Sequence, residues 1–377
     1  MTCVGKSSFN MSADQKPARF RCPNCNADMD FDPQSGALKC RYCAHIEATP
    51  TAVQSPSLLH PLKEFLAKGD EHLGQMADQS LQVTCEGCGS MVVFQPPQVA
   101  GLCSFCAAAI IAQPKAADPL IAPDGVLPFK VPTNEAQAQV RQWLQTRWFA
   151  PNALKRMARS EGIGGVYLPF WDYASDTDSR YSGQRGTHYW ETEVYQESDG
   201  RGGTVQQTRQ VQRTAWSPVS GRVSRHFDHV LIAATRSIAE SKLNALEPWD
   251  MEAVCTYEPA YLAGFKAQRY QVELPAGFEE AQAVMRQQIE EDAREDIGGD
   301  EQRVQSVDTE YSNTTFCHLL LPVWIGAYRF RDKVYQVVVN ARTGEVQGER
   351  PYSPWKISLL VAAILFVLLL IWLAKSQ

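Results

Sequence analysis

The spacing of apolar residues between 278 and 297 predicts the clearest element of the chain. Apolar side chains recur there every three or four residues, the spacing that places them on one side of an α-helix. They are Phe278, Ala281, Met285, Ile289, Ala293 and Ile297. Gly298 and Gly299 follow and predict the end of this helix. The opposite side is largely acidic, so we expect a buried apolar stripe and a solvated acidic face.

Alternation of apolar and polar residues predicts strands on both sides of this helix. About seven runs of alternating or β-branched residues lie between 166 and 340. Residues 188–196 and 204–216 flank the glycine-rich segment SDGRGG, which predicts a long β-hairpin. The second of these runs is polar on both faces, so part of the hairpin is expected to project from the core. The segments YLPFWDY (167–173) and LLPVWIGAY (320–328) resemble each other and suggest a divergent internal repeat.

Three stretches nearer the N-terminus have helical spacing. Residues 62–78 predict a short helix after a proline-containing spacer. Thr133 or Asn134 can cap a second helix. The apolar face of this second helix is expected to comprise Ala136, Val140, Trp143, Leu144 and Trp148. Pro151 suits the first turn of a third helix, which is expected to end at Gly162.

The last hydrophobic run differs from the others because it has no polar face. Residues 357–374 carry no charge, and as a helix they would span about 27 Å, close to the ~30 Å of bilayer hydrocarbon. A buried core helix is disfavoured because only three residues follow and nothing after it completes a cover. We therefore expect one C-terminal transmembrane helix. Arg350 and Lys356 precede it, and this basic flank predicts that the bulk of the chain lies in the cytoplasm.

The composition is that of an ordinary folded protein with room for two to three domains. The 377 residues are 44% hydrophobic and 21% charged, with a formal net charge of −6. A protein that binds nucleic acid usually has a basic excess, which this chain lacks. Its first ten residues also lack the apolar segment of a secretory signal. We therefore expect a reducing compartment, where paired cysteines are metal ligands before they are disulfides.

Eight of the eleven cysteines form two quartets with identical spacing. The quartets are Cys22, Cys25, Cys40 and Cys43, and then Cys85, Cys88, Cys103 and Cys106. Each consists of two Cys-x-x-Cys pairs separated by fourteen residues, and the second repeats the first 63 positions later. Four thiolates suit a tetrahedral Zn²⁺, and a hairpin between the pairs would make each module a zinc ribbon. A rubredoxin-like iron site is the alternative that remains open. Because all four ligands come from the chain, both ions are predicted to be structural.

The two cysteine modules also agree at other positions. Phe31 corresponds to Phe94, Pro33 to Pro96 and Tyr42 to Phe105. A module of this size buries too little apolar surface to fold alone, and metal binding, worth about 10–16 kcal/mol, would supply the missing stability. The shared aromatic residues are expected to form what core each module has.

The charge of this region favours protein partners over nucleic acid. Residues 1–120 contain nine Lys and Arg against eleven Asp and Glu, and each Zn²⁺ with four thiolates adds a formal charge of −2. Affinity for a duplex depends largely on cations that neutralise phosphates. Nucleic-acid binding is therefore the second hypothesis, and docking of a protein is the first.

No catalytic site can be named. The segment RHFDHV brings His226, Asp228 and His229 together in the sequence, but in a regular strand the two histidines would point to opposite faces. A metal site there is disfavoured, and the role of His226 and His229 is left open. Cys255 and Cys317 are interpreted as small core residues. No nucleophile with a neighbouring base stands out, so the chain is not expected to be an enzyme.

Several stretches resemble a bacterial family of tail-anchored double zinc-ribbon proteins, often labelled relatives of primosomal protein N-prime, the replication-restart helicase. The resemblance covers roughly residues 20–356 and includes CPNC with CRYC, LPFW, SPVSG, LEPWD, YLAGF, DIGGDEQR, SVDTEYS, LLPVW and TGEVQGERP. The helicase label is not matched by an ATPase motif, because Gly5-Lys6-Ser7 lacks the earlier glycine of a phosphate-binding loop. The resemblance implies instead partners of the SPFH (flotillin-like) or phage-shock protein A type. It transfers no catalytic residue.

Together these patterns predict an α+β multidomain protein. It would comprise a flexible leader (1–19), a zinc ribbon (20–48), a linker with a short helix (49–82), a second ribbon (83–114), a linker with two helices (115–165), a strand-rich α+β domain (166–350), and a juxtamembrane segment with a tail anchor (351–377). The expected function is a non-enzymatic adaptor that recruits such partners to the cytoplasmic face of the bacterial inner membrane. Its oligomeric state is left open. The alternative is a membrane-attached nucleic-acid-binding or replication-restart accessory factor.

Overall fold

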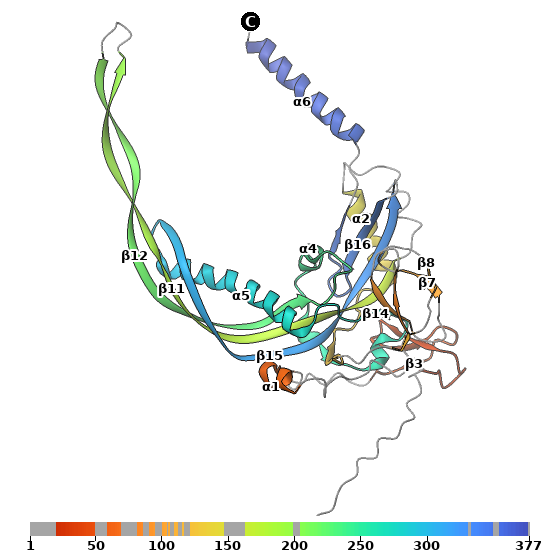
Figure 1. The fold of residues 1–377 in the computed structure, drawn as a ribbon. Coiled ribbons are helices and arrows are strands. Elements are labelled where there is room, and N and C mark those ends of the chain that lie inside the picture. Colours follow the sequence, from red (N-terminus) through yellow and green to blue (C-terminus); the bar gives the residue numbers. More distant parts are fainter. Residues whose placement is uncertain are drawn as a thin grey trace, which may run out of the picture.

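The protein is a strand-rich α+β structure with one large sheet, a separate group of cysteine-bearing strands and an apolar C-terminal helix (Figure 1). This computed structural model describes residues 20–49, 59–68, 81–85, 90–94, 100–103, 105, 109–111, 115–116, 121–146, 163–198, 204–330, 333–349 and 354–375. The predicted leader, the helix after Pro151 and the tip of the long hairpin lie outside these residues.

Three very long antiparallel strands form the centre of the large sheet. They are β11 (Gly164–Ser198), β12 (Thr204–Ala233) and β15 (Glu301–Phe330). Shorter strands complete the sheet: β4 (His60–Pro61), β10 (Gly125–Val126), β13 (Cys255–Thr256), β14 (Lys266–Ala267), β16 (Lys333–Asn340) and β17 (Val346–Gly348). The main order is β12-β11-β15-β10-β13. The sequence pattern predicted about seven comparable runs, whereas strands of 30 to 35 residues dominate.

The two similar sequence segments, 167–173 and 320–328, lie next to each other in this sheet. Tyr167 is opposite Pro322 and Pro169 is opposite Leu320 in the antiparallel pairing of β11 with β15. Residues 166–173 and 316–325 are buried on both faces. Tyr167 and Leu320 belong to one apolar cluster, whereas their neighbours Val166, Leu168, Leu319 and Leu321 belong to another on the opposite face. This double burial explains why these runs are almost continuously apolar.

Helix α5 (Leu274–Ile297) covers one face of the long strands and confirms the predicted stripe. Ala281, Met285, Ile289, Ala293 and Ile297 are all buried, and the first three pack with Trp171 and Tyr173 of β11. Gly298 follows in the left-handed region, with φ of 63°, where glycine meets no steric cost. Figure 1 shows the strands curving around this helix.

β-Bulges occur in β12 and β15, the two strands beside β11, where the sheet curves around α5. They keep apolar side chains of these strands on the side that faces α5. On β12, Phe227 and Val230 are three positions apart, yet both contact the core under α5. Regular alternation would place them on opposite faces. The register shifts between these two residues, where His229 has a positive φ, and β15 has a similar shift beside Asn313. The extra residue of a β-bulge turns the side chains that follow it back toward the same face of the sheet, and it also bends the strand.

Shorter helices also occur among the described residues. They include α1 (Leu62–Ala67), α2 (Thr133–Gln145), α4 (Glu240–Asn244) and two 3₁₀ turns, η3 (Met251–Ala253) and η4 (Pro259–Leu262). Helix α2 buries Ala136, Val140 and Leu144 as expected, but the prediction of its cap was wrong. The capping position is Pro132, and Thr133 is already the first helical residue. Proline has no side-chain oxygen that could accept a hydrogen bond from the first turn, so no side-chain cap is made.

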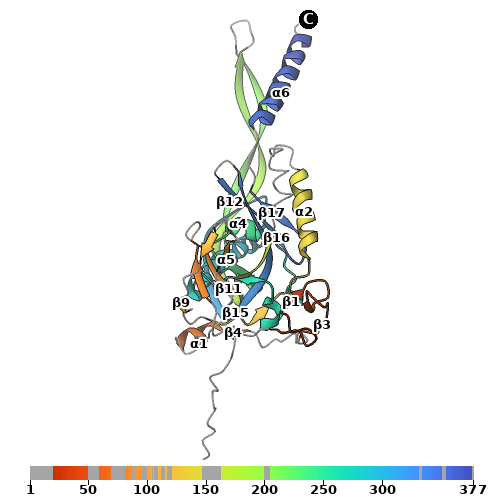
Figure 2. The same cartoon turned by 90° about the vertical axis from the view of Figure 1, so that its right-hand side faces the viewer.

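The hairpin of β11 and β12 projects beyond the rest of the sheet, as predicted. The pairing of β15 with β11 ends where Glu301 meets Gly186, whereas β11 and β12 remain paired to Ser198 and Thr204. Twelve residues of each strand therefore form a two-stranded ribbon, 187–198 with 204–215. Figures 1 and 2 show this ribbon as a twisted arm that continues past α5.

The C-terminal helix α6 (Pro354–Lys375) is apolar along its length. Residues 358–375 are long and apolar enough to cross a membrane, and none of this window is buried in the protein. The apolar side chains of α6 are therefore exposed on every side of the helix, unlike those of α5.

Candidate metal centre

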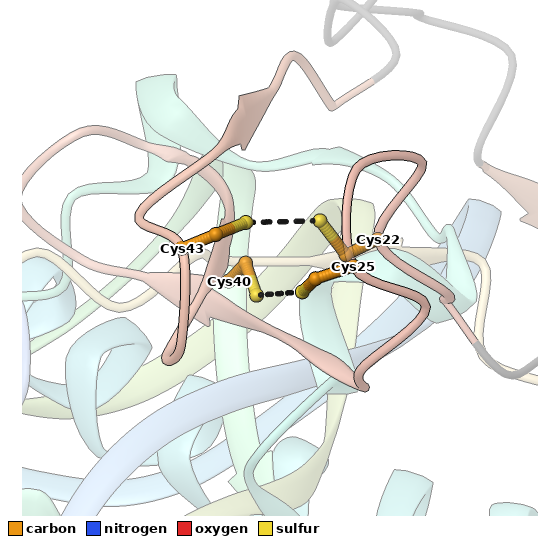
Figure 3. A group of neighbouring side chains, drawn as sticks. All are labelled: Cys22, Cys25, Cys40 and Cys43. Carbon is orange, nitrogen blue, oxygen red and sulfur yellow. Dashed lines mark hydrogen bonds between the residues drawn. The ribbon is translucent and has the colours of Figure 1, made fainter.

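Four cysteines of the first module meet at one point. The module contains β1 (Met29–Asp32), β2 (Ala37–Cys40) and β3 (Ile46–Glu47), with one Cys-x-x-Cys pair before β1 and the other at the end of β2. Cys22 Sγ lies 3.3 Å from Cys43 Sγ, and Cys25 Sγ lies 3.4 Å from Cys40 Sγ (Figure 3). All four sulfurs lie within 4.8 Å of one another. This cluster could bind a metal ion.

The sulfur separations are compatible with tetrahedral coordination. Four sulfurs at ~2.3 Å from a zinc ion would be roughly 3.8 Å apart, a value between the shortest contact of 3.3 Å and the 4.8 Å limit. The predicted β-hairpin creates this arrangement, because β1 and β2 pair from Met29 with Cys40 to Asp32 with Ala37. The hairpin returns the second pair of cysteines to the first.

The electrostatics of the cluster favour a cation among the thiols. The backbone N–H groups of Cys43 and Tyr42 donate to the sulfur of Cys40 and lower the pKa of this thiol to about 6. The N–H of His45 lowers the pKa of Cys43, but the other three sulfurs and desolvation raise it to about 12. Four thiolates this close repel one another unless a positive ion offsets their charge.

The cluster provides a complete ligand set. Cys22 and Cys40 are buried, whereas Cys25 and Cys43 are exposed, so the centre lies at the surface of its module. Because four protein sulfurs fill a tetrahedron, an ion bound there would keep no open position for a substrate. The arrangement suits a structural ion.

The first module packs directly on the large domain. Phe31 is 3% exposed, and its ring centroid lies 5.4 Å from that of Tyr261 in η4. Its backbone N–H also donates to Ala263 O at 3.0 Å. Met29 and Leu38 join the same apolar cluster as residues of the large sheet. The module and the sheet thus share one core.

The second quartet lies partly outside the described residues, which include Cys85 and Cys103 but not Cys88 and Cys106. Its strands are β5 (Leu81–Thr84), β6 (Met91–Phe94), β7 (Ala100–Leu102), β8 (Ala109–Ile111) and β9 (Lys115–Ala116). Cys85 and Cys103 are both 2% exposed. Among the described strands, β6 pairs with β5 and β7 with β8, so the hairpin predicted between the two cysteine pairs is not among these pairings.

Where the two modules can be compared, their backbones repeat at an interval of 63 residues. Cys22 N donates to Ala27 O at 2.8 Å, and Cys85 N donates to Ser90 O at 2.9 Å. The pairing of Lys39 with Ile46 recurs in that of Leu102 with Ala109, and the bridge between Arg21 and Asp28 recurs in the pairing of Thr84 with Met91. The described hydrogen bonds and pairings that flank the cysteine pairs are therefore alike in the two modules.

The same repeat relates the second cysteine pairs. The N–H of Tyr42 donates to the sulfur of Cys40, and the N–H of Phe105 donates to Cys103 Sγ at 3.4 Å. Both aromatic residues were predicted to be core. Phe105 is 1% exposed and confirms this, but for Tyr42 the prediction was wrong, since it is 83% exposed. Among the described residues, the large domain covers the ring of Phe105, whereas the ring of Tyr42 lies on the solvent side of its turn.

The structure corrects the prediction for His226 and His229. His226 Nδ1 lies 2.6 Å from Asp176 Oδ1, and His229 Nδ1 lies 2.8 Å from Asp172 Oδ2. Both carboxylates lie on the face of β11 that points away from α5. The bulge between Phe227 and Val230 adds one residue, so the two histidines share a face. The even spacing of the two aspartates on one strand was the signal for this cluster.

This histidine cluster does not converge on one point. His226 also contacts Asp228, through Nε2 at 3.0 Å, so its two carboxylate partners lie on opposite edges of the ring. Within the described ranges, the first cysteine quartet is the group of three or more potential ligands that comes close enough to hold an ion. Cys255 and Cys317 are buried at 1% and 3% exposure, as predicted for core residues.

Comparison with known proteins adds a relative of similar length. No protein-family profile matches the chain, and no solved structure matches it. The uncharacterized protein YdjG of Bacillus subtilis (strain 168) is 25% identical over 347 residues, which cover 90% of this chain and 92% of that protein. The similarity extends along nearly the whole of both chains and is not limited to the cysteine modules.

Proposed function

We propose that this protein is a non-enzymatic adaptor, anchored by α6 in the bacterial inner membrane, that binds partner proteins through its zinc-containing modules. The bulk of the chain would lie in the cytoplasm, as the basic residues before α6 favour. The main support for this proposal is the contrast between Tyr42 and Phe105, which occupy equivalent positions in the two modules but are 83% and 1% exposed.

The second module already uses this position to dock on protein. Phe105 lies in an apolar cluster with Leu127, Leu319 and Val338 of the large domain. The side-chain amide of Gln336 donates to its backbone carbonyl at 2.7 Å. At the tip of this module, an aromatic side chain and a backbone carbonyl thus both contact the surface of the large domain. The first module presents the same tip, with Tyr42, to the solvent.

Exposed aromatic side chains of this kind are typical of protein interfaces. A tyrosine combines a large apolar area with a hydroxyl group and loses little conformational freedom on binding. Ile46, on the neighbouring strand, is 52% exposed and extends the apolar surface. Arg41 precedes Tyr42, but its guanidinium pairs with Asp30 of the same module. The tip therefore offers little free positive charge for a phosphate backbone.

The apolar character of helix α6 supports its proposed role as a membrane anchor. A helix with apolar side chains on every side has no face that prefers water, and a bilayer satisfies such a helix. Its backbone groups are bonded within the helix, which removes the main obstacle to burial in lipid. An anchor confines the adaptor to a surface and raises its effective concentration for partners there.

We propose zinc for both quartets. The first has the complete ligand set, and the repeated hydrogen bonds around Cys85 and Cys103 support an equivalent second site with Cys88 and Cys106. Sites with four thiolates can hold either zinc or iron. We propose zinc because two Cys-x-x-Cys pairs joined by a short hairpin are typical of structural zinc sites. Each ion would keep its docking tip in one conformation.

For partners, we propose envelope proteins of the SPFH or phage-shock protein A type, on the basis of the sequence resemblance. Proximity labelling in the native cells tests this with the full chain, with Tyr42→Ala and with a chain that ends at Pro354. The wild type should label such proteins, and both variants should label them at least fivefold less. Tyr189→Ala, at an exposed aromatic residue on the ribbon, is the matched control and should behave as wild type. A wild type that labels no envelope protein would refute the proposal.

A further inference from the structure

The projecting ribbon, 187–198 with 204–215, has two faces of different character. One, the charged face, consists of Tyr189, Glu191, Glu193, Tyr195, Glu197, Val205, Gln207, Arg209, Val211 and Arg213. The other, the neutral face, consists of His188, Trp190, Thr192, Val194, Gln196, Gln206, Thr208, Gln210, Gln212 and Thr214. The strand register places each cross-strand pair on one face or the other. Every Asp, Glu, Lys and Arg of these twenty residues is on the charged face.

Four of the five charged side chains of the charged face are ion-paired with one another: Glu191, Glu193, Arg209 and Arg213. Arg209 Nη2 lies 3.0 Å from Glu193 Oε2, and Arg213 Nε lies 3.1 Å from Glu191 Oε2. The guanidinium of Arg209 also lies over the ring of Tyr195, 5.5 Å from its centroid. This face is an ion-paired surface that water can cover without further partners.

The neutral face has one comparable contact, at its base, where His188 Nε2 lies 2.9 Å from Glu301 Oε1 of β15. Trp190 is 65% exposed and Val194 is 62% exposed, with Thr and Gln side chains around them. An isolated two-stranded hairpin is only marginally stable in water. Natural sheets usually place charges on exposed strands to prevent association, and this face of the ribbon lacks that protection.

The chemistry of the neutral face fits a second copy of itself. Threonine hydroxyls and glutamine amides both donate and accept hydrogen bonds, so two identical faces can satisfy each other. Stacked glutamine ladders and dry contacts between identical uncharged strands are stable packings. A strongly charged partner, such as nucleic acid or an anionic lipid surface, would find no Asp, Glu, Lys or Arg among the ten residues of this face. Because the ribbon twists (Figure 2), two such faces would coil around each other.

We propose that the neutral face is a self-association surface, on which the ribbons of two copies of this chain pack face to face. Nine residues at ~3.3 Å and two strands ~4.8 Å apart give each face a projected area of about 300 Å². This is below the ~800 Å² per partner of a standard interface. The pairing of two ribbons is therefore expected to be weak in solution. The fraction of paired copies in the cell rests on the proposed anchor, which concentrates the chains in the membrane.

Photocrosslinking of the full chain tests the pairing directly. Two differently tagged copies are expressed together, with the photoreactive residue benzoylphenylalanine at Thr192 on the neutral face or at Glu193 on the charged face. After irradiation of intact membranes, one tag is isolated and the other is detected. We expect an adduct of both tagged copies from position 192, at a yield at least tenfold above that from position 193.

Two matched valines provide the variants. Val194→Lys places a charge on the neutral face and should reduce the adduct from position 192 at least fivefold. Val205→Lys makes the same change on the charged face, where Glu197 is opposite, and should leave the yield unchanged. Equal yields from positions 192 and 193, equal effects of the two lysines, or adducts at 192 that lack the second tag would each overturn the proposal. Carbonate extraction of the same membranes reports separately on the anchor.

Discussion

Tyr42 and Phe105 lie 63 residues apart at equivalent points of two cysteine modules, yet the first is 83% exposed and the second 1% exposed. Their backbone N–H groups make the same contact, each with the sulfur of the cysteine two residues earlier. The difference therefore comes from what lies outside each module. The large sheet covers Phe105, whereas the first module docks through Phe31 and leaves Tyr42 free.

Phe31 and Tyr42 should respond very differently to truncation. Phe31→Ala removes a ring that is 3% exposed and packed on Tyr261, so we expect it to destabilise the docked module by about 3–5 kcal/mol. Tyr42→Ala removes an exposed ring and should change stability by less than about 0.5 kcal/mol. Urea unfolding followed by metal release measures both. Equal losses would show that Tyr42 is buried in solution.

Metal content distinguishes one site from two. Elemental analysis of the full chain should give two zinc ions per chain, with one lost in Cys40→Ser and the other in Cys103→Ser, because each change removes one of four ligands. Cys255→Ser is the control and should keep both ions, since Cys255 belongs to neither quartet and its sulfur donates to Val126 O at 3.3 Å. One zinc in the wild type would argue against the second site.

Gly277 permits α5 to approach the sheet closely. A Cβ at this position would lie 2.7 Å from Trp171 Cδ1 and 2.7 Å from the hydroxyl of Tyr173. Both rings are fully buried and cannot move aside. We expect Gly277→Ala to destabilise the protein by about 1–3 kcal/mol despite its higher helix propensity. Val284→Ala, at a 52% exposed position of the same helix, should cost almost nothing in the same thermal unfolding experiment.

The pH dependence of stability should reflect His226. Hydrogen bonds to Asp176 and Asp228 raise the pKa of this imidazole, because both carboxylates favour its charged form. A raised pKa in the folded state gives stability that is present below the ordinary value of ~6.5 and is lost as the pH rises through the raised value.

Comparison of the wild type with His226→Gln tests this contribution. Thermal unfolding of the full chain in detergent should show a larger advantage of the wild type at pH 6 than at pH 8. The effect should be below about 1 kcal/mol, since the pair is exposed. Asp178→Asn, on the same face of β11, should not alter the difference between the two pH values. An advantage that grows from pH 6 to pH 8 would contradict the assigned pairing.

A charge in the middle of α6 should abolish membrane association. Leu365 is near the centre of the helix and is 60% exposed, so in a bilayer its side chain would contact lipid. Leu365→Arg should make insertion less favourable by about 2.5–3.5 kcal/mol and shift the chain to the carbonate-soluble fraction. Leu365→Ala should remain in the pellet. A wild type extracted by carbonate would disprove the anchor.

Local patterns in the sequence were sufficient for several elements. The stripe from Phe278 to Ile297 predicts α5 because helical spacing alone selects its buried face. The spacing of Cys22, Cys25, Cys40 and Cys43 predicts their convergence because two short turns and one hairpin bring them together. The uniform apolarity of 357–374 predicts a helix without a polar face. Each of these depends on residues close together in the chain.

Other features required contacts between distant segments. The facing of His226 and His229 depends on a bulge that maintains contact with α5, so strand alternation alone gave the wrong answer. Two residues an odd number of positions apart point to opposite faces only if the strand is regular between them, and the extra residue of this bulge brings both histidines to one face.

The sequence by itself thus determined the cysteine quartet, the amphipathic α5 and the apolar character of α6. The tertiary structure decided the length and curvature of the three central strands, the two faces of the ribbon and the exposure of Tyr42. The physical reason is that spacing along the chain sets which side chains share a direction, whereas burial depends on whether another part of the protein reaches them.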